Sequence, residues 1–456
     1  MERSWSTVRH ECSRYWPITA TSLAMYMVAA GTFSFMGTLT QSAVQHEFMV
    51  SVGDFSAVLG LVQMLRLPFM LLSGPIIDCL SPGVAVCIAQ ALMAILSFLM
   101  GSGFVTSIRQ YYLLRSALFT VSPLGDIPAH VCVQSSYFDA AQPLVIGIIN
   151  AGYSLAGSWM PVTLALLVGA CGWRSAWVVS GVLGVALTAL GAVMVRRPGP
   201  LPVGTAVSRD PMSTKPLAGL RMGEAVRTRA FWALLISLAC TLYWEGTITN
   251  HLLLVLQLDA HKSLSEASAY YSLQYAFAIV GKVSSGALMR LVPRRLFFLL
   301  GPLVFCLVHV LLLEPTTGAS NAVLALPPAL SHALAAVGAS SIRVTTSSTR
   351  FRAFAVLYGL SFGLTHSMLT IQPAHLFGRV HLPYLQTIAK AVDVAGVSLG
   401  QIGSGWLYDA TGSYAGPLLL TFGVSALNVV SCSVLACAPG VEERGATAAR
   451  RPGALL

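Results

Sequence analysis

The sequence VRRPGPLPVGTAVSRDPMSTKPLAGLRMGEAVRTR, residues 195–229, is the longest polar and basic interruption in an otherwise apolar chain. Its arginines and lysine outnumber its two acidic residues, Asp210 and Glu224, and its prolines and glycines resist regular structure. Several long apolar segments lie on each side of it. Because basic loops remain on the cytoplasmic side of a membrane, this stretch is predicted to be a cytoplasmic linker between two membrane-embedded halves.

The composition agrees with a membrane protein. Of 456 residues, 55% are hydrophobic and only 10% are charged, with a mean hydropathy of +0.73, whereas about a quarter of the residues in a soluble domain are charged. The formal net charge of +10 comes from basic residues in short loops beside apolar segments, as the positive-inside rule describes. We therefore expect a lipid bilayer, and no nucleic acid, as the partner of this charge.

The apolar segments are long enough to cross a bilayer, which requires roughly 20 residues per helix. They predict an all-α membrane protein with twelve transmembrane helices in two six-helix halves. The predicted helices cover residues 16–39, 55–77, 83–103, 111–133, 143–167, 173–194, 230–256, 267–289, 295–313, 353–373, 384–408 and 415–437.

The predicted domain organisation follows from these helices. It comprises an N-terminal tail (1–15), an N-terminal bundle (16–194), the linker (195–229), a C-terminal bundle (230–437) and a C-terminal tail (438–456). The distribution of arginine and lysine places both tails in the cytoplasm. We expect the plasma membrane rather than an organelle membrane.

One predicted connection, residues 314–352, is much longer than the others. Its middle is apolar but contains Pro327 and Pro328. We expect an external loop with a surface helix in preference to a thirteenth membrane span.

Seven ionisable residues fall deep within the predicted helices, where each costs at least about 2.5 kcal/mol unless it has a partner or a function. The cations are Arg66, Arg115, Lys282 and Lys390, and the anions are Asp126, Glu245 and Asp393. Lys282 and Lys390 lie at similar depth from the inner ends of their helices, so their ammonium groups could face one cavity. A desolvated lysine that gains a partner when a carboxylate arrives is suited to binding an anion.

Structural roles are the alternative for both lysines. Lys390 could pair with Asp393, because residues three apart share a helix face. Lys282 could instead extend its ammonium group to the inner membrane interface.

The remaining ionisable residues have alternatives too. Arg66 requires compensation by Asp126, by Glu245 or by a substrate anion. Arg115 and Asp126 share nearly one face of a helix but lie about 16 Å apart, so they need separate partners. Glu245 could carry a proton, since burial favours the neutral carboxyl, or it could pair with an arginine.

The layout resembles the major facilitator superfamily, whose two halves rock around a central site. Gly74-Pro-Ile-Ile-Asp78 resembles that superfamily's cytoplasmic gating motif, although the usual arginines are absent. Its counterpart, Gly286-Ala-Leu-Met-Arg290, has an arginine in place of the aspartate. The resemblance implies that Gly74, Asp78, Gly286 and Arg290 form a cytoplasmic gate.

Within that superfamily, several stretches of the sequence resemble the monocarboxylate porters and the oxalate/formate antiporters. Residues 143–183 resemble their fifth and sixth helices, with Gly172-Trp173-Arg174 as the loop signature, and residues 399–416 fit the same group. Lys282-Val-Ser-Ser-Gly286 and Thr387-Ile-Ala-Lys390 match the positions whose cations bind carboxylates in the antiporters. By this resemblance Lys282 and Lys390 would bind substrate, and Arg115 matches an arginine common in the fourth helix of the superfamily.

Two departures affect the expected coupling. Ala278 occupies the position of an aspartate that helps to couple protons in monocarboxylate porters, and their motif before the first helix is replaced by Arg14-Tyr-Trp-Pro17. Both departures favour exchange or another anion over proton-coupled transport of lactate or pyruvate.

Together these features predict a secondary active transporter of a small organic anion, a mono- or dicarboxylate, working by alternating access as a proton symporter or an anion exchanger. Lys282, Lys390, Arg66 and Arg115 are the candidate substrate-binding residues, and Glu245, Asp126 and Asp393 are candidates for proton coupling or charge pairing. One alternative is a transporter of a neutral or zwitterionic solute such as an amino acid; another is a non-transporting membrane sensor on the same fold. No nucleotide-binding loop or metal-ligand cluster is present in the sequence, so we expect neither an enzyme nor a cofactor.

Overall fold

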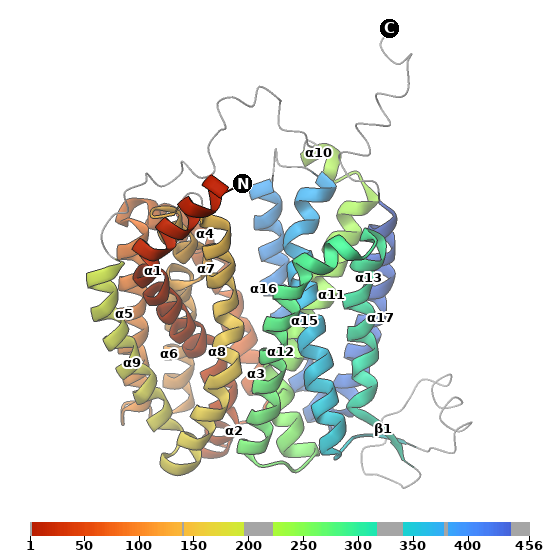
Figure 1. The fold of residues 1–456 in the computed structure, drawn as a ribbon. Coiled ribbons are helices and arrows are strands. Elements are labelled where there is room, and N and C mark those ends of the chain that lie inside the picture. The colour runs from red at the N-terminus through yellow and green to blue at the C-terminus, as the bar shows by residue number, and fades with distance from the viewer. Residues whose placement is uncertain (1, 139–140, 196–221, 317–340, 378–381, 439–456) are drawn as a thin grey trace. The chain divides into compact units, whose positions relative to one another are not determined.

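The computed structural model describes residues 2–138, 141–195, 222–316, 341–377 and 382–438, some of them by their backbone alone. The described chain is almost entirely helical (Figure 1). Seven of its helices are long and apolar enough to cross a membrane by length and composition alone. The predicted linker and C-terminal tail, and the middle of the predicted external loop, lie largely outside the described residues.

The chain divides into two compact units. Unit 1 contains residues 1–212 and 262–276, and unit 2 contains residues 213–261 and 277–456. The helical elements of unit 1 are α1 (Glu2–Ala30), η1 (Gly31–Phe35), α2 (Met36–Phe48), α3 (Val52–Met64), α4 (Arg66–Leu80), α5 (Pro82–Gly101), α6 (Ile108–Val121), η2 (Ser122–Gly125), α7 (Ile127–Ser135), α8 (Gln142–Cys171) and α9 (Trp173–Met194). The first helix begins at Glu2, whereas the sequence pattern predicted a start at residue 16, because polar residues 2–15 continue the helical turn.

Unit 2 contains α10 (Met222–Ala225), α11 (Arg229–Leu254), η3 (Val255–Asp259), α13 (Arg294–Val308), η4 (His309–Leu311), α15 (Ser348–Phe377), α16 (Leu382–Thr411) and α17 (Ala415–Cys437). The first part of α12 (Leu264–Leu291) groups with unit 1 and the rest with unit 2. Apart from the short α10, the helices and their short continuations make twelve helical stretches in the described chain, and each overlaps one predicted span. The prediction of an all-α, twelve-helix membrane protein is confirmed.

Small residues allow close helix packing in both units. In unit 1, Gly181 and Gly184 of α9 lie directly against Ala94 of α5. In unit 2, α11 and α16 are in close contact where Gly400 lies against the backbone of Tyr243. Because lipid tails are as apolar as leucine, close backbone approach at small residues supplies much of the attraction between membrane helices.

Several helices of unit 1 are interrupted. The second predicted helix is divided at Leu65 into α3 and α4, although the Leu65 backbone stays helical, and the fourth divides into α6, η2 and α7 around Pro123 and Asp126. The first contains the π-helical segment η1. The sequence pattern predicts each of these as one unbroken span, because apolar residues continue through the interruptions.

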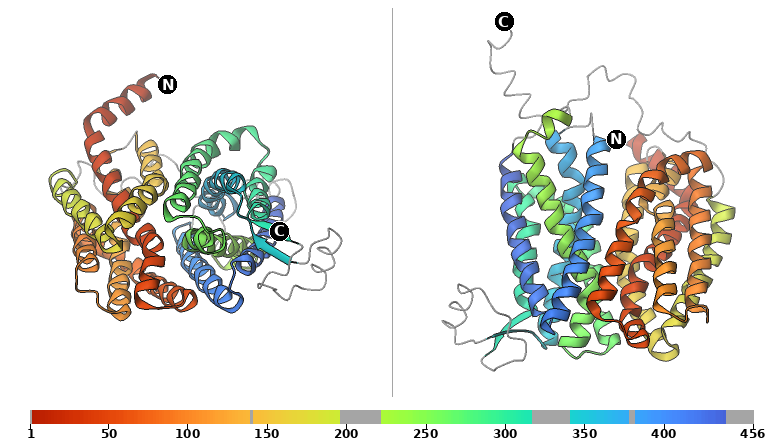
Figure 2. Two further views of the ribbon diagram at one scale, coloured as in Figure 1. Left: turned by 90° about the horizontal axis from the view of Figure 1, so that it is seen from below. Right: turned by 180° about the vertical axis from the view of Figure 1, so that it is seen from behind.

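The long connection between α13 and α15 begins and ends in a two-stranded antiparallel sheet. Strand β1 (Leu313–Thr316) pairs with β2 (Ser341–Val344), with Leu313 opposite Val344. In Figures 1 and 2 the sheet lies at one end of the unit 2 helices. Glu314 of β1 accepts hydrogen bonds from Arg343 at 2.7 Å and from Thr345 at 3.0 Å. The sheet was not predicted, and the expected surface helix falls outside the described residues.

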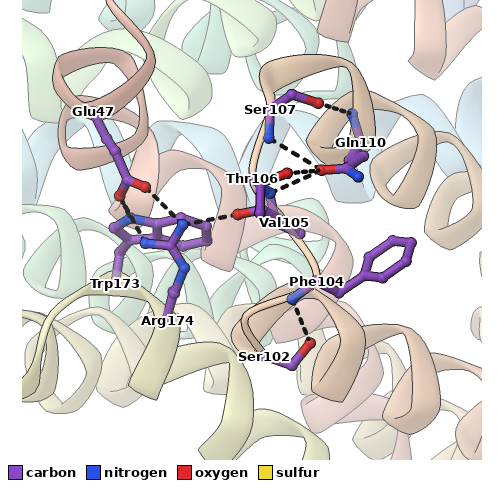
Figure 3. A network of polar contacts seen from close by, with 9 residues as sticks. All are labelled: Glu47, Ser102, Phe104, Val105, Thr106, Ser107, Gln110, Trp173 and Arg174. Atoms are coloured by element: carbon purple, nitrogen blue, oxygen red, sulfur yellow. Dashed lines mark hydrogen bonds and ion pairs between the residues drawn. The ribbon is translucent and has the colours of Figure 1, made fainter.

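A polar network joins three connections at one end of unit 1 (Figure 3). Arg174 donates to both carboxylate oxygens of Glu47, at 2.8 and 2.6 Å, and to the carbonyl of Val105 at 2.9 Å. The indole of Trp173 donates to the same carboxylate at 2.7 Å, and the Arg174 guanidinium lies 4.3 Å from the centre of that ring. The Trp-Arg pair that follows Gly172 therefore ties the α8–α9 turn to the end of α2 and to the chain before α6.

Candidate functional site

Three ionisable side chains and one aromatic ring come together within unit 2. His366 Nε2 of α15 is hydrogen-bonded to Glu245 Oε2 of α11 at 2.9 Å, and the Glu245 side chain is only 12% exposed. The ring centre of Phe362 lies 4.4 Å from that of His366 and 5.9 Å from the ammonium nitrogen of Lys282 on α12. Lys282 is partly buried, and its charge interacts with that of Glu245. We name Glu245, Lys282, Phe362 and His366 the unit 2 cluster.

Close packing of α12 on α15 positions Lys282. A Cβ atom on Gly281 would overlap the carbonyl of Leu360, and one on Gly363 would lie 2.6 Å from the backbone nitrogen of Lys282. Only glycine permits this approach. It sets the first carbons of the lysine side chain beside α15, where the ammonium group lies within about 6 Å of an aromatic face, the usual range of a cation–π contact.

Glu245 is held in place by the packing of α11 against α16. Gly246, the next residue, lies against the backbone of Val397, and a Cβ atom there would overlap it. Thr247 and Ser404 add a hydrogen bond of 2.9 Å between the same two helices. The α11 backbone on both sides of Glu245 is therefore fixed against α16, while its carboxylate reaches His366.

The other predicted residues of unit 2 are described less fully. Lys390 lies on α16, but its side chain is outside the described residues, so its predicted alternatives of substrate contact and pairing with Asp393 are not tested. Asp393 lies on the same helix and is partly buried.

In unit 1 the structure brings Arg66 and Asp126 together in an ion pair between Arg66 Nη2 and Asp126 Oδ2. Their side chains are 11% and 19% exposed. The Arg66 guanidinium also lies 4.9 Å from the ring centre of Phe33. From the sequence, the alternative partners of Arg66 were Asp126, Glu245 and a substrate anion. In the structure its partner is Asp126.

The helix interruptions create this arrangement. Arg66 is the first residue of α4, Asp126 precedes α7 as its N-cap, and Phe33 lies in the π-helical segment η1. Asp126 Oδ1 accepts a hydrogen bond from the backbone nitrogen of Ile127 at 2.8 Å, as an N-cap side chain does. Discontinuous membrane helices expose backbone and side-chain groups to buried sites, and such helices form the binding sites of many transporters.

Arg115 has separate surroundings. Arg115 is only 3% exposed, and its guanidinium donates a hydrogen bond to the carbonyl of Phe33 at 3.1 Å. The guanidinium lies 5.0 Å from the ring centre of Phe119 and 5.6 Å from that of Trp177. None of the described carboxylates forms an ion pair with it. These contacts suit a structural cation that satisfies the carbonyls of the irregular first helix.

The predicted gate is only partly described. Gly74 lies within α4 with open space around its Cα, and α4 continues past Pro75 to Leu80. The side chains of Asp78 and Arg290 and the surroundings of Gly286 are outside the described residues. The gate therefore stays a prediction.

Two contributors were missed from the sequence. The sequence pattern did not identify His366 as a partner of Glu245, yet an intramembrane carboxylate such as Glu245 needs a hydrogen-bond donor, and that need could have indicated a nearby histidine. Phe33 gave no signal, because an aromatic residue in an apolar helix has no distinguishing pattern. Among the described residues, no group of three or more His, Cys, Asp or Glu side chains is placed to hold a metal ion.

Comparison with models of protein families identifies one family. The sequence model of the Major Facilitator Superfamily matches residues 21–352. No curated protein sequence matches the chain.

Solved structures of transporters share the fold. A bacterial homologue of the human lysosomal transporter Spinster, in an inward-facing and unoccupied conformation, is 14% identical with a TM-score of 0.66, covering 97% of this chain and 99% of its own. The same homologue in an occupied conformation has a TM-score of 0.63 at 13% identity, with 92% and 95% coverage. A mutant of the nucleoside transporter NupG has a TM-score of 0.66 at 13% identity, with 92% and 99% coverage.

Proposed function

Because the chain belongs to the Major Facilitator Superfamily and is a multi-pass membrane transporter rather than an enzyme, we propose that it moves a small organic anion, a mono- or dicarboxylate. The transport is secondary active, by alternating access, with a proton or a counter-anion as the coupled species. The proposal rests on the resemblance of several stretches of the sequence to the monocarboxylate porters and the oxalate/formate antiporters.

The unit 2 cluster is the observation that carries this proposal. A lysine within a membrane helix, held 5.9 Å from the Phe362 ring, offers an ammonium group and an apolar wall to a small carboxylate. Glu245, the nearby acid, already accepts a hydrogen bond from His366, so its negative charge is shared between two groups. A carboxylate that reaches Lys282 therefore competes for its ammonium group with Glu245, whose own negative charge is partly stabilised by His366. Lys390 on α16 is proposed as a second contact for the carboxylate.

Charge balance suggests how coupling works in this cluster. With His366 neutral, Lys282 and Glu245 contribute one positive and one negative charge. An incoming carboxylate adds a negative charge that the membrane interior disfavours. Uptake of a proton, or departure of another anion, restores the balance. Glu245, Asp126 and Asp393 are the proposed acids for coupling.

In unit 1, Arg66 and Arg115 stay candidate anion contacts. Arg66 is the stronger candidate, because its side chain is 11% exposed whereas Arg115 is almost fully enclosed. Both termini are proposed to be cytoplasmic, in the plasma membrane, with the gate formed by Gly74, Asp78, Gly286 and Arg290.

A second candidate cargo is a zwitterionic solute such as an amino acid. The adjacent opposite charges of Arg66 and Asp126 favour it, since one could receive a carboxylate and the other an ammonium group. This cargo would keep the fold and the transport mechanism.

Uptake into proteoliposomes tests the proposal. Purified protein is reconstituted and supplied with labelled formate, oxalate, lactate or alanine, either with an inward proton gradient or after loading with unlabelled solute. We expect uptake of a carboxylate that Lys282→Gln abolishes and the matched control Lys262→Gln retains. Uptake of alanine alone would establish the zwitterion candidate, and uptake of a carboxylate by Lys282→Gln at the wild-type rate would refute the role of the unit 2 cluster.

A further inference from the structure

The Arg66–Asp126 pair lies where two membrane helices are irregular. The fourth helix is interrupted before Asp126 and the first is π-helical around Phe33, whereas the second keeps a helical backbone through Leu65. Interrupted turns lack part of the regular backbone hydrogen bonding, so small shifts there disturb fewer bonds than in an unbroken helix. The pair can therefore separate without unwinding a regular segment.

Arg66 has unused hydrogen-bonding capacity. Its Nη2 donates to Asp126, but its Nε is buried and has no hydrogen-bond partner. Arginine donors are arranged to bind both oxygens of a carboxylate at once. A buried donor without an acceptor is costly, and an arriving carboxylate would satisfy it.

The charges around Asp126 can be assigned element by element within unit 1. The elements packed against this part of the chain are α1, α4, α5, α6 and α8. Neither α5 nor α8 contains Asp, Glu, Lys, Arg or His. The described groups whose charges interact with that of Asp126 are Arg66 of α4, Tyr26 of α1 and His130 of α7. Arg115 of α6 instead lies over the rings of Phe119 and Trp177.

Among these groups, Arg66 is the cation that compensates Asp126. Arg115 is occupied with the carbonyl of Phe33, and His130 Nδ1 is hydrogen-bonded to Ser22 Oγ at 2.8 Å. If Arg66 turned to another carboxylate, Asp126 would be left as an uncompensated anion inside the membrane. Neutralisation by a proton is then favoured.

We propose that a cargo carboxylate displaces Asp126 from Arg66, and that Asp126 then takes up one proton from water. This inference rests on the proposed function and adds the site and number of the coupled protons. The Arg66–Asp126 bond breaks, an Arg66–cargo bond forms, and one proton joins Asp126 Oδ2. One carboxylate and one proton enter together, so the charge of unit 1 is unchanged.

The backbone supports the protonated state. Asp126 Oδ1 remains free to accept the hydrogen bond from Ile127 after Oδ2 is protonated, so the cap of α7 persists. Release of the cargo allows Asp126 to lose its proton and return to Arg66. Cargo and proton thus bind cooperatively, and each favours the other by the same factor.

The pH dependence of binding tests this inference. Dissociation constants for formate and oxalate are measured with purified wild-type protein, Asp126→Asn and the matched control Asp54→Asn, at closely spaced values of pH. Asparagine also caps helices well, so the substitution keeps the start of α7.

If one proton is taken up per carboxylate, the wild-type dissociation constant rises about tenfold for each unit increase in pH over the range in which that proton is taken up. Asp54→Asn should keep this slope and Asp126→Asn should lose it. Binding whose slope persists in Asp126→Asn would overturn the inference alone. Failure of both anions to bind the wild-type protein would overturn the proposed function and the inference with it.

Infrared difference spectroscopy detects protonation of a carboxylate directly. This measurement depends neither on the binding affinity nor on whether Asp126→Asn folds. Addition of oxalate to the wild-type protein should produce the stretching band of a protonated carboxylic acid, and Asp126→Glu should shift the band. A band that is absent on binding, or unmoved by Asp126→Glu, would contradict protonation of Asp126.

Discussion

Removing the charge of Asp126 should destabilise the protein more than removing both charges of the pair. Loss of one partner from a fully buried ion pair costs about 3–5 kcal/mol, because the other charge is left uncompensated. The Arg66 and Asp126 side chains are 11% and 19% exposed, so water relieves part of this cost. We expect about 3 kcal/mol for Asp126→Asn in the absence of cargo.

The helix cap separates the charge effect from a local backbone effect. Asp126→Asn keeps an oxygen for the backbone nitrogen of Ile127, which now donates at 2.8 Å. Asp126→Ala loses it and should cost about 1 kcal/mol more. The double variant Arg66→Gln with Asp126→Asn has no uncompensated charge and should be more stable than Asp126→Asn alone, by roughly 1–2 kcal/mol.

Unfolding of the purified protein in detergent, followed by thermal denaturation and by denaturant titration, measures these differences. A double-mutant cycle isolates the interaction of the pair from the effects of each residue. Costs that simply add in the double variant would show that the two charges do not stabilise one another, and would refute the account of unit 1.

Two further predictions concern packing and pH. Gly400→Ala should destabilise unit 2, because its Cβ would overlap the Tyr243 carbonyl, whereas the control Gly423→Ala, with open space around it, should be neutral or stabilising by up to about 1 kcal/mol; equal melting temperatures would contradict this. Burial raises the pKa of Glu314, but the hydrogen bonds from Arg343 and Thr345 and the nearby arginine charges outweigh it, so the net pKa is lowered. The contribution of the Glu314 carboxylate to the free energy of unfolding is therefore complete above the pKa of an unfolded glutamate. It is lost as the pH falls through the lowered pKa of the folded protein. The melting-temperature difference between wild type and Glu314→Gln should shrink on acidification, and a difference that grows would contradict the direction.

The sequence predicts the helices of this protein well, because a bilayer imposes one length and one polarity on every span. The irregularities within them are harder to predict. The fourth helix contains Pro123 and Pro128, but the apolar run around them is long enough for a span, so it is predicted unbroken from the sequence. The π-helical segment near Phe33 has no sequence signal of its own.

The sequence predicts which residues belong to the candidate site better than it predicts which of them contact each other. Intramembrane charge identifies Arg66, Asp126, Glu245 and Lys282 from the sequence alone, since each requires compensation. Which charges meet depends on how distant helices pack. The bond between Glu245 and His366 joins residues 121 positions apart, and local spacing carries no information on such a contact.

The central claim is that this transporter carries a small organic anion and that Lys282 contacts it. The most direct test is thermal stabilisation of the purified protein across mono- and dicarboxylates, amino acids and sugars, repeated with Lys282→Gln, Lys390→Gln and the control Lys262→Gln. We predict stabilisation by a carboxylate that is lost in the first two variants and kept in the third. Stabilisation only by amino acids or sugars, or by a carboxylate regardless of Lys282, would contradict the claim.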